Sequence, residues 1–199
     1  MSQETKISIT HSLAENIFQQ TGVKASRCYQ CGKCSAGCPM NIEMDFPPSV
    51  IMRLLQTNLP EDESDILKSA AIWYCLTCEM CIARCPMEVD IPKVMDYLRQ
   101  ESIKQKLPNR KAAEIIAFHR AFLKSIELTG RLYEVGVIAA YKTKTLNLFQ
   151  DLSLAPVMLL KGKLKFIPEK VKNIKNIKAI FQQTFHRKSE FESLRTGKA

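Results

Sequence analysis

RCYQCGKCSAGCPM (residues 27–40) and YCLTCEMCIARCPM (residues 74–87) are two copies of one pattern, Cx2Cx2Cx3CP. Each copy packs four cysteines into a short stretch and places a proline after the fourth. All eight cysteines of the chain lie in these two stretches, which are named the first and the second cysteine run. The first run consists of Cys28, Cys31, Cys34 and Cys38, and the second of Cys75, Cys78, Cys81 and Cys85.

Two explanations for such a density of cysteines fit this chain poorly. A disulfide framework is typical of short secreted domains, but the chain opens MSQETKISITHSLAEN, without the basic segment, apolar run and small-residue cleavage site of an export signal. We therefore expect a reducing, cytoplasmic environment. Structural zinc sites usually take two ligand pairs that are separated by a longer loop, whereas three cysteines follow one another at x2 spacing here.

The spacing favours iron-sulfur clusters over both alternatives. One short loop can aim three thiolates at three corners of a cubane cluster, while the fourth cysteine, next to a proline that cannot donate a backbone hydrogen bond, points elsewhere. In two-cluster ferredoxins of this spacing, the fourth cysteine of each run ligates the other cluster. Carried over to this chain, that topology predicts two 4Fe-4S clusters. Cluster 1 would be held by Cys28, Cys31, Cys34 and Cys85, and cluster 2 by Cys75, Cys78, Cys81 and Cys38.

The segments around the two runs predict helices. SLAENIFQQTG reads as a short helix with Ser12 as N-cap and Gly22 near its end. MDFPPSVIMRLLQTN predicts a helix with Val50, Ile51, Leu54 and Leu55 on one face, and DESDILKSAAIWYC predicts a single helix that leads into the second run. DIPKVMDYLRQESIKQK predicts another helix, with Asp90 as N-cap. No segment alternates at period two over the length of a strand, so we expect an all-α, helical ferredoxin-like domain.

The rest of the chain reads as a helical extension. PNRKAAEIIAFHRAFLKSIELTG and RLYEVGVIAAYKTKTLNLFQ predict two helices, and DLSLAPVMLLKGKLKFIPEK predicts an irregular apolar arm. Most of the basic surplus behind the formal net charge of +9 lies between residues 161 and 188. An apolar stripe at helical spacing leaves these lysines on the opposite side and predicts docking to a partner protein. The stripe consists of Ile174, Ile177, Ile180, Phe181 and Phe185.

These patterns predict two domains and exclude several partners. We expect a ferredoxin domain with two 4Fe-4S clusters over residues 1–107, and a helical extension with a basic docking arm over residues 108–199. No apolar run is long enough to span a bilayer, so a membrane partner is not expected. No recognised nucleic-acid motif accompanies the basic segment, so nucleic acid is not expected either.

With both cysteine runs, the helical segments between them and the stretches GRLYEVG and LAPVMLLKGKLKFIPEKVK in view, the chain resembles the C subunit of heterodisulfide reductase. The resemblance implies a cytoplasmic electron carrier that takes electrons from the flavin-containing A subunit of such a complex and passes them to its catalytic B subunit, which has CCG domains. It also implies that all eight cysteines are cluster ligands. The cysteine motifs alone are shared with iron-sulfur subunits of succinate or fumarate reductases and of glycerol-3-phosphate dehydrogenases.

The chain itself carries no signature of a catalytic subunit. It contains no CCG, no GxGxxG turn for a dinucleotide and no assembled hydrolase pattern. We therefore expect electron transfer without turnover of a substrate on this chain. The alternative functions are an iron-sulfur carrier subunit of a membrane-associated, quinone-linked dehydrogenase, a structural zinc protein and a basic nucleic-acid binder.

Overall fold

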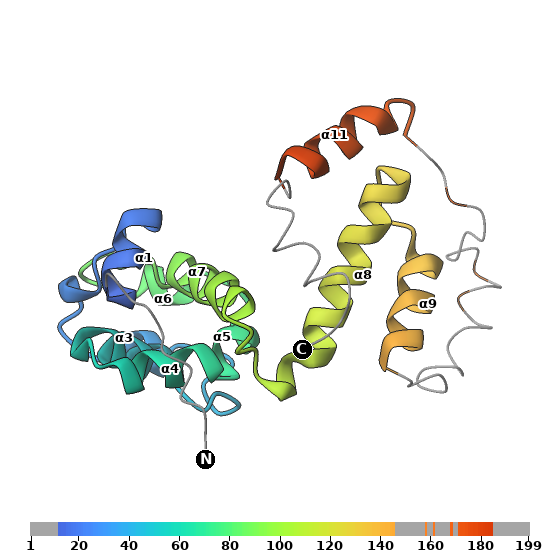
Figure 1. The fold of residues 1–199 in the computed structure, drawn as a ribbon. Helices are drawn as coiled ribbons and strands as arrows, with labels where there is room; N and C mark the ends of the chain where they lie inside the picture. The colour runs from blue at the N-terminus through green and yellow to red at the C-terminus, as the bar shows by residue number, and fades with distance from the viewer. Residues whose placement is uncertain (1–11, 146–157, 159–160, 162–167, 169–170, 185–199) are drawn as a thin grey trace, which may run out of the picture. The chain divides into compact units, whose positions relative to one another are not determined.

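The computed structural model describes residues 12–145, 158, 161, 168 and 171–184 (Figure 1). It divides into a unit that ends at residue 112 and a unit that begins at residue 113, whereas the sequence predicts a boundary after residue 107. The described residues of both units form helices and turns, and no β-strand occurs among them. The all-α prediction is therefore confirmed.

The first unit is built around one central helix, α7 (Ile91–Lys104). It packs against α1 (Leu13–Thr21), α4 (Pro60–Lys68), α5 (Ala71–Tyr74) and α6 (Met80–Ala83). The remaining elements are the 3-10 turns η1 (Ala25–Arg27) and η2 (Arg110–Ala112), α2 (Lys33–Ala36) and α3 (Pro48–Thr57). The core consists of apolar side chains that are almost completely removed from water: Ile17, Ile51, Leu55, Ile66, Ile72, Val94, Met95 and Leu98.

Local capping determines where α1 and α7 begin. The Ser12 hydroxyl oxygen accepts a hydrogen bond from the Glu15 amide, and Gly22 ends α1 in the left-handed conformation at φ 74°. The Asp90 carboxylate accepts from the Lys93 amide at 3.2 Å and thereby caps α7. Both helix starts predicted from the sequence are confirmed.

The predicted inner face of α3 is wrong at one position. Val50 is 38% exposed, while Met52 is fully buried beside Ile51 and Leu55. Two faces of this apolar helix satisfy the 3.6-residue period, because Met52 can replace Val50 on the buried side. Which face turns inward is decided by the helices that pack on α3, namely α1, α2 and α4.

The segment predicted as one helix before the second run is two helices. α4 ends at Lys68, Ser69 is extended at ψ 143°, and α5 begins at Ala71. The break is stabilised from a distance, because the Asp45 carboxylate accepts hydrogen bonds from the Ser69 hydroxyl and from the amides of Ala70 and Ala71. The Ala70 amide would have no partner at this helix start without such an acceptor, while the Ala71 amide also donates to the Ser69 hydroxyl oxygen at 3.0 Å.

The second unit contains α8 (Ala113–Thr129), α9 (Glu134–Thr145) and α11 (Ile174–Thr184). α8 packs against both of the others, and the carbonyl oxygen of Thr129 accepts a backbone hydrogen bond from Val171 at 3.0 Å. Gly130 follows α8 at φ 81°, where an added Cβ would lie 2.8 Å from Val171 Cγ2. The long helix predicted to end near Gly130 is confirmed.

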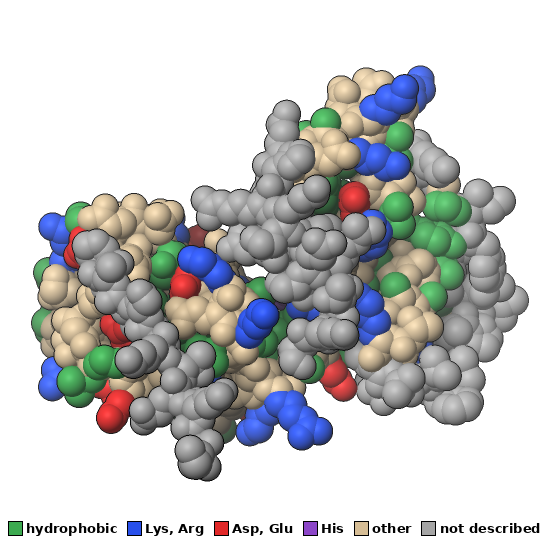
Figure 2. All heavy atoms as spheres, in the orientation of Figure 1, with side chains coloured by type: hydrophobic (Ala, Val, Ile, Leu, Met, Phe, Trp, Pro, Cys, Tyr) green, Lys and Arg blue, Asp and Glu red, His purple; other side chains and the backbone are tan. Residues whose placement is uncertain are grey.

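α11 carries the basic surface that the sequence predicts. Lys175 and Lys178 on the helix and Lys172 just before it are exposed, and Figure 2 shows blue side chains over this helix. Of the predicted apolar stripe, Ile174 and Ile177 are half-buried, but Ile180 is 60% exposed. Phe185 and nearly all of the predicted apolar arm lie outside the described residues. None of the described helices is long and apolar enough to cross a membrane.

Candidate iron-sulfur site

The two cysteine runs have the same backbone path. The second residue after the first cysteine is left-handed in both runs, at Gln30 with φ 64° and at Thr77 with φ 54°. The fourth residue after it is left-handed as well, at Gly32 with φ 74° and Glu79 with φ 61°. A left-handed residue other than glycine costs on the order of 1 kcal/mol. Both loops therefore carry a modest backbone strain, at Gln30 in the first run and at Thr77 and Glu79 in the second.

After these turns, each run continues into a single helical turn, α2 in the first run and α6 in the second, and the two turns pack against each other. The two runs thus lie next to each other in space although 36 residues separate Cys38 from Cys75. Such proximity is the first requirement of crossed ligation.

One cavity combines cysteines from both runs. Cys38, the last cysteine of the first run, lines it together with Cys75, Cys78 and Cys81. Its other walls are mostly apolar side chains from the segment after the first run, from α3, from the second run and from α7: Pro39, Met40, Met44, Pro48, Leu76, Met80, Ile91, Pro92 and Met95. The cavity therefore brings together the four residues predicted to hold cluster 2.

Three of the remaining four cysteines, Cys28, Cys31 and Cys85, are related through Tyr29. The pKa of the Tyr29 phenol is raised, first by its hydrogen bond with Cys31, then by desolvation, and then by the charges of Cys31, Cys85 and Cys28. Cys85, the last cysteine of the second run, thus acts electrostatically on the first run. Its sulfur also accepts a hydrogen bond from the Val89 amide at 3.4 Å.

Burial sets the acidity of three of the thiols. It raises the pKa of Cys81 to about 11, and it raises the pKa values of Cys34 and Cys75. A buried thiol does not ionise readily unless positive charge stabilises the thiolate. The cationic core of an iron-sulfur cluster supplies such charge and takes thiolate ligands. Four sulfurs around an apolar cavity are therefore a donor set that fits this cofactor.

Water reaches both runs at the same position. Cys31 and Cys78, the second cysteine of each run, are exposed, whereas Cys34 is buried and the other five are intermediate. A backbone hydrogen bond from Lys33 lowers the pKa of Cys31. In the part of the chain that the structure describes, no three or more His, Cys, Asp or Glu side chains are placed to hold one metal ion.

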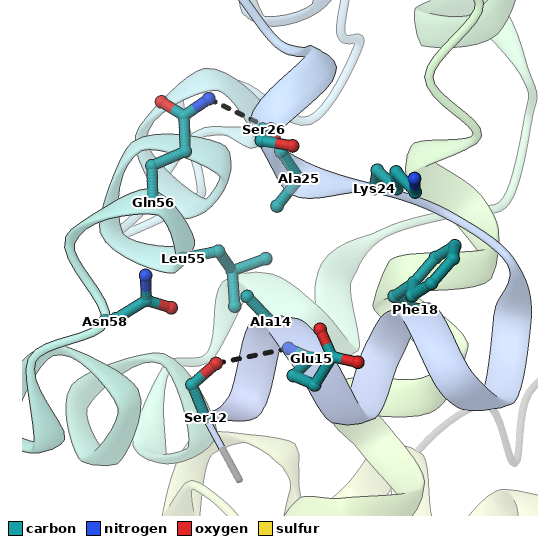
Figure 3. A pocket seen from close by; sticks show the side chains of 10 residues that line it. All are labelled: Ser12, Ala14, Glu15, Phe18, Lys24, Ala25, Ser26, Leu55, Gln56 and Asn58. Atoms are coloured by element: carbon teal, nitrogen blue, oxygen red, sulfur yellow. Dashed lines mark hydrogen bonds between the residues drawn. The ribbon is translucent and has the colours of Figure 1, made fainter.

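Gln56 on α3 holds the start of the first run. Its Nε2 donates to the carbonyl oxygens of Ala25, at 2.9 Å, and of Cys28, at 2.6 Å. Figure 3 shows the amide of Gln56 and its hydrogen bond toward Ala25. This pair of hydrogen bonds is named the Gln56 clamp.

The Gln56 clamp lies beside an open groove of about 590 Å³ that α1, η1 and the end of α3 line (Figure 3). The Lys24 ammonium lies 4.7 Å from the centre of the Phe18 ring at one side of this groove. None of the residues that line the groove is a cysteine, so the groove is separate from the cluster cavity.

Arg99 on α7 holds the start of the second run. Its Nε donates to the carbonyl oxygen of Ile72 at 2.5 Å, and its Nη2 donates to the carbonyl oxygen of Cys75. Its Nη1 pairs with Asp96 at 2.9 Å. The hydrogen bonds to Ile72 and Cys75 are named the Arg99 clamp.

The sequence did not single out the three side chains that hold these loops, namely Gln56, Arg99 and Asp45. The repeated sequence pattern contains a signal for two of them. Gln56 and Arg99 are both the ninth residue of the helix that follows their run, counted from Pro48 in α3 and from Ile91 in α7. An alignment of the two halves that includes these helices as well as the cysteines places Gln56 opposite Arg99. Asp45 has no counterpart of this kind.

Comparison with known proteins places this site in a group of relatives. The 4Fe-4S dicluster domain family matches residues 24–89, which include both runs. One relative is form 2 of the iron-sulfur C subunit of the CoB–CoM heterodisulfide reductase of Methanocaldococcus jannaschii. It is 32% identical over 161 residues, which cover 77% of this chain and 79% of that protein.

Two further relatives match over a shorter part of the chain. The iron-sulfur C subunit of the CoB–CoM heterodisulfide reductase of Methanopyrus kandleri is 34% identical over 94 residues, 47% of each chain. The C subunit of the H2:CoB–CoM heterodisulfide,ferredoxin reductase of Methanothermobacter thermautotrophicus is 31% identical over 99 residues, 50% of this chain and 52% of that one. In these two relatives the chain therefore matches only about half of the protein.

Proposed function

The chain belongs to the family of the iron-sulfur C subunits of CoB–CoM heterodisulfide reductases, and from this premise we propose that it relays electrons within a heterodisulfide reductase-like complex. Electrons would enter from the flavin-containing A subunit of the complex and leave to its catalytic B subunit with CCG domains. Two 4Fe-4S clusters would carry them across this chain, with cluster 1 on Cys28, Cys31, Cys34 and Cys85, and cluster 2 on Cys75, Cys78, Cys81 and Cys38.

One observation carries the cluster assignment. Cys38 lines one cavity with three cysteines of the second run, although 36 residues separate it from Cys75, the first of them. If each run held a cluster by itself, Cys38 would be needed beside Cys34 and Cys31. The influence of Cys85 on Tyr29 in the first run supports the reciprocal exchange.

The side chains of this domain position, bury and connect the two clusters. Bound clusters supply one-electron transfer. Cys38 and Cys85 tie each loop to the other, so the distance between the two sites is fixed by covalent connections and by the packing of α2 on α6. Met44, Met95 and Ile91 keep water from the inner side of the second site. The protein thus supplies distance and environment, which are the properties that set a tunnelling rate.

The partners would approach where the runs open to solvent. Cys31 and Cys78 are exposed, and large side chains next to these openings are also in water, with Tyr29 58% and Leu76 62% exposed. Exposed aromatic and aliphatic side chains beside a redox centre suit a protein contact. The basic α11 in the second unit offers a separate docking surface for an acidic protein surface.

The test is anaerobic purification of the native assembly, with iron, acid-labile sulfide and every co-eluting polypeptide determined. We expect about eight irons and eight sulfides on this chain, together with a flavoprotein and a CCG-bearing subunit. Zinc in place of iron would overturn the cluster chemistry. A membrane subunit in place of the CCG protein would favour the quinone-linked dehydrogenase instead.

A further inference from the structure

Gln56 and Arg99 do the same structural work in the two halves of the first unit. Each is the ninth residue of the helix after its run. Each donates to the carbonyl of the first cysteine of that run, Cys28 or Cys75, and to the carbonyl three positions before it. The clamps therefore match in geometry, but one is a neutral amide and the other a permanent cation.

The charge of Arg99 is partly shielded from water. Its side chain is 17% exposed, whereas the side chain of its partner Asp96 is 51% exposed. Water therefore screens the carboxylate more than the guanidinium. The cation lies close to a predicted ligand, because Arg99 Nη2 donates a hydrogen bond to the carbonyl oxygen of Cys75.

The clamp of the first run contains no cation. Lys33 also acts on Cys31 electrostatically, but it is exposed, and an exposed charge contributes little after screening by water and salt. The two sites thus differ in fixed positive charge at the same structural position.

We infer that Arg99 is a positioning residue that also raises the reduction potential of cluster 2, and this inference rests on the two-cluster assignment proposed above. Reduction by one electron adds one negative charge at the second run, with no other bond made or broken. A partly buried cation beside the Cys75 carbonyl stabilises that added charge. Gln56 holds the first run without this effect. Arg99 therefore favours the state in which the transferred electron is on cluster 2.

The experiment is a redox titration followed by electron paramagnetic resonance on the full-length chain, with iron counted for each variant. In Arg99→Gln we expect the ratio of reduced to oxidised cluster 2, at a fixed ambient potential, to fall about tenfold. For a one-electron couple this equals a shift of about 59 mV to more negative potential. The midpoint of cluster 1 should stay in place.

Two further variants separate charge from geometry. Arg99→Lys keeps the charge but loses the forked clamp, so its midpoint should lie closer to that of the wild type than the midpoint of Arg99→Gln does. Lys104→Gln removes one positive charge from an exposed position of the same helix, where the side chain is 56% exposed, and should shift neither midpoint. Equal shifts in Arg99→Gln and Arg99→Lys would overturn the inference, because charge would not then be the cause.

If Arg99→Gln fails to bind its clusters, Asp96→Asn tests the effect of the Arg99 charge on cluster 2 while both hydrogen bonds of the Arg99 clamp remain. Removing the counter-charge of Arg99 should move cluster 2 to a more positive potential, and a shift to a more negative potential would overturn the inference. A wild-type chain without about eight irons would instead refute the proposed two-cluster function. The two failures are therefore distinguishable in the same samples.

Discussion

The two cysteine runs are nearly identical in spacing and in backbone, yet they stand in different surroundings. Both repeat Cx2Cx2Cx3CP and both turn through left-handed residues at equivalent positions. The first run follows a 3-10 turn and is held by the neutral Gln56, whereas the second follows α5, which Asp45 starts, and is held by Arg99. The spacing of the cysteines thus defines the ligands, while side chains from other segments give each site its own properties.

The largest expected effect comes from breaking the crossing between the runs. Cys85→Ser should remove or damage the cluster of Cys28, Cys31 and Cys34, because Cys85 is its fourth ligand under the crossed scheme. The iron content should fall from about eight toward about four per chain. Iron analysis and electron paramagnetic resonance measure both changes.

Matched variants identify which cluster is lost. Cys31→Ser damages the same cluster in the crossed scheme and should give the same spectral loss as Cys85→Ser. Cys78→Ser should give the complementary loss. A Cys85→Ser spectrum that matches Cys78→Ser would show that each run holds its own cluster.

Asp45→Asn tests the difference in how the two runs begin. The carboxylate accepts hydrogen bonds from the Ser69 hydroxyl and from two amides at the start of α5, and losing a cap of this kind lowers the free energy of unfolding by about 1–2 kcal/mol. Chemical denaturation measures the loss. Asp65→Asn, at an exposed position of α4, is the control and should change stability by less than about 0.5 kcal/mol.

The pH dependence of the stability difference between the wild type and Asp45→Asn follows from the ionisation of Asp45. Its pKa is lowered from 3.8, because hydrogen bonds from Ser69, Ala70, Ala71 and Phe46 together outweigh the opposing effect of burial, the largest single cause. A lowered pKa contributes stability that is fully present above the unfolded value and is lost as the pH falls through the folded value. The difference between wild type and Asp45→Asn should thus be the same at pH 7 and pH 5. A difference that shrinks over this range would contradict the assigned ionisation.

The sequence predicts the parts of the fold that depend on neighbours in the chain. Ser12, Gly22 and Asp90 cap helices through contacts within four residues, and all three were predicted. The break at Ser69 was missed because its acceptor, Asp45, is 24 residues away in the sequence. Val50 was placed inward because helical periodicity leaves the choice between two adjacent faces to the neighbouring helices.

The same distinction applies to the candidate site. The crossed partners of Cys38 and Cys85 came from the ferredoxin pattern and stay a prediction, with the shared cavity of Cys38 in their support. Gln56 lies 28 residues after the carbonyl of Cys28 that it holds, and Arg99 lies 24 residues after that of Cys75. The repeat pairs Gln56 with Arg99 as the ninth residue of their helices, but it does not identify either side chain as the donor to a distant carbonyl. The clamps therefore required the structure.

Gln56→Arg transfers the charge of the second clamp to the first. The open groove beside Gln56 gives the longer side chain room (Figure 3), so we expect cluster 1 to move to a more positive potential while cluster 2 stays in place. Because this groove is open to water, the shift should be smaller than that of Arg99→Gln. Gln56→Glu is the matched control of opposite charge and should move cluster 1 the other way. Shifts of the same sign in both variants would show that damage to the clamp, and not charge, is responsible.

The smallest effect is expected at the position just before the fourth cysteine, where the runs carry Gly37 and Arg84. An added Cβ on Gly37 would lie 2.6 Å from Arg84 Cδ, so the two equivalent positions lie against each other. Gly37 has φ −103°, which alanine adopts without strain, and Arg84 is exposed and can move aside. Gly37→Ala should therefore change the free energy of unfolding by less than about 0.5 kcal/mol. A loss above about 2 kcal/mol that disappears in Gly37→Ala combined with Arg84→Ala would instead show that the arginine is fixed between the runs.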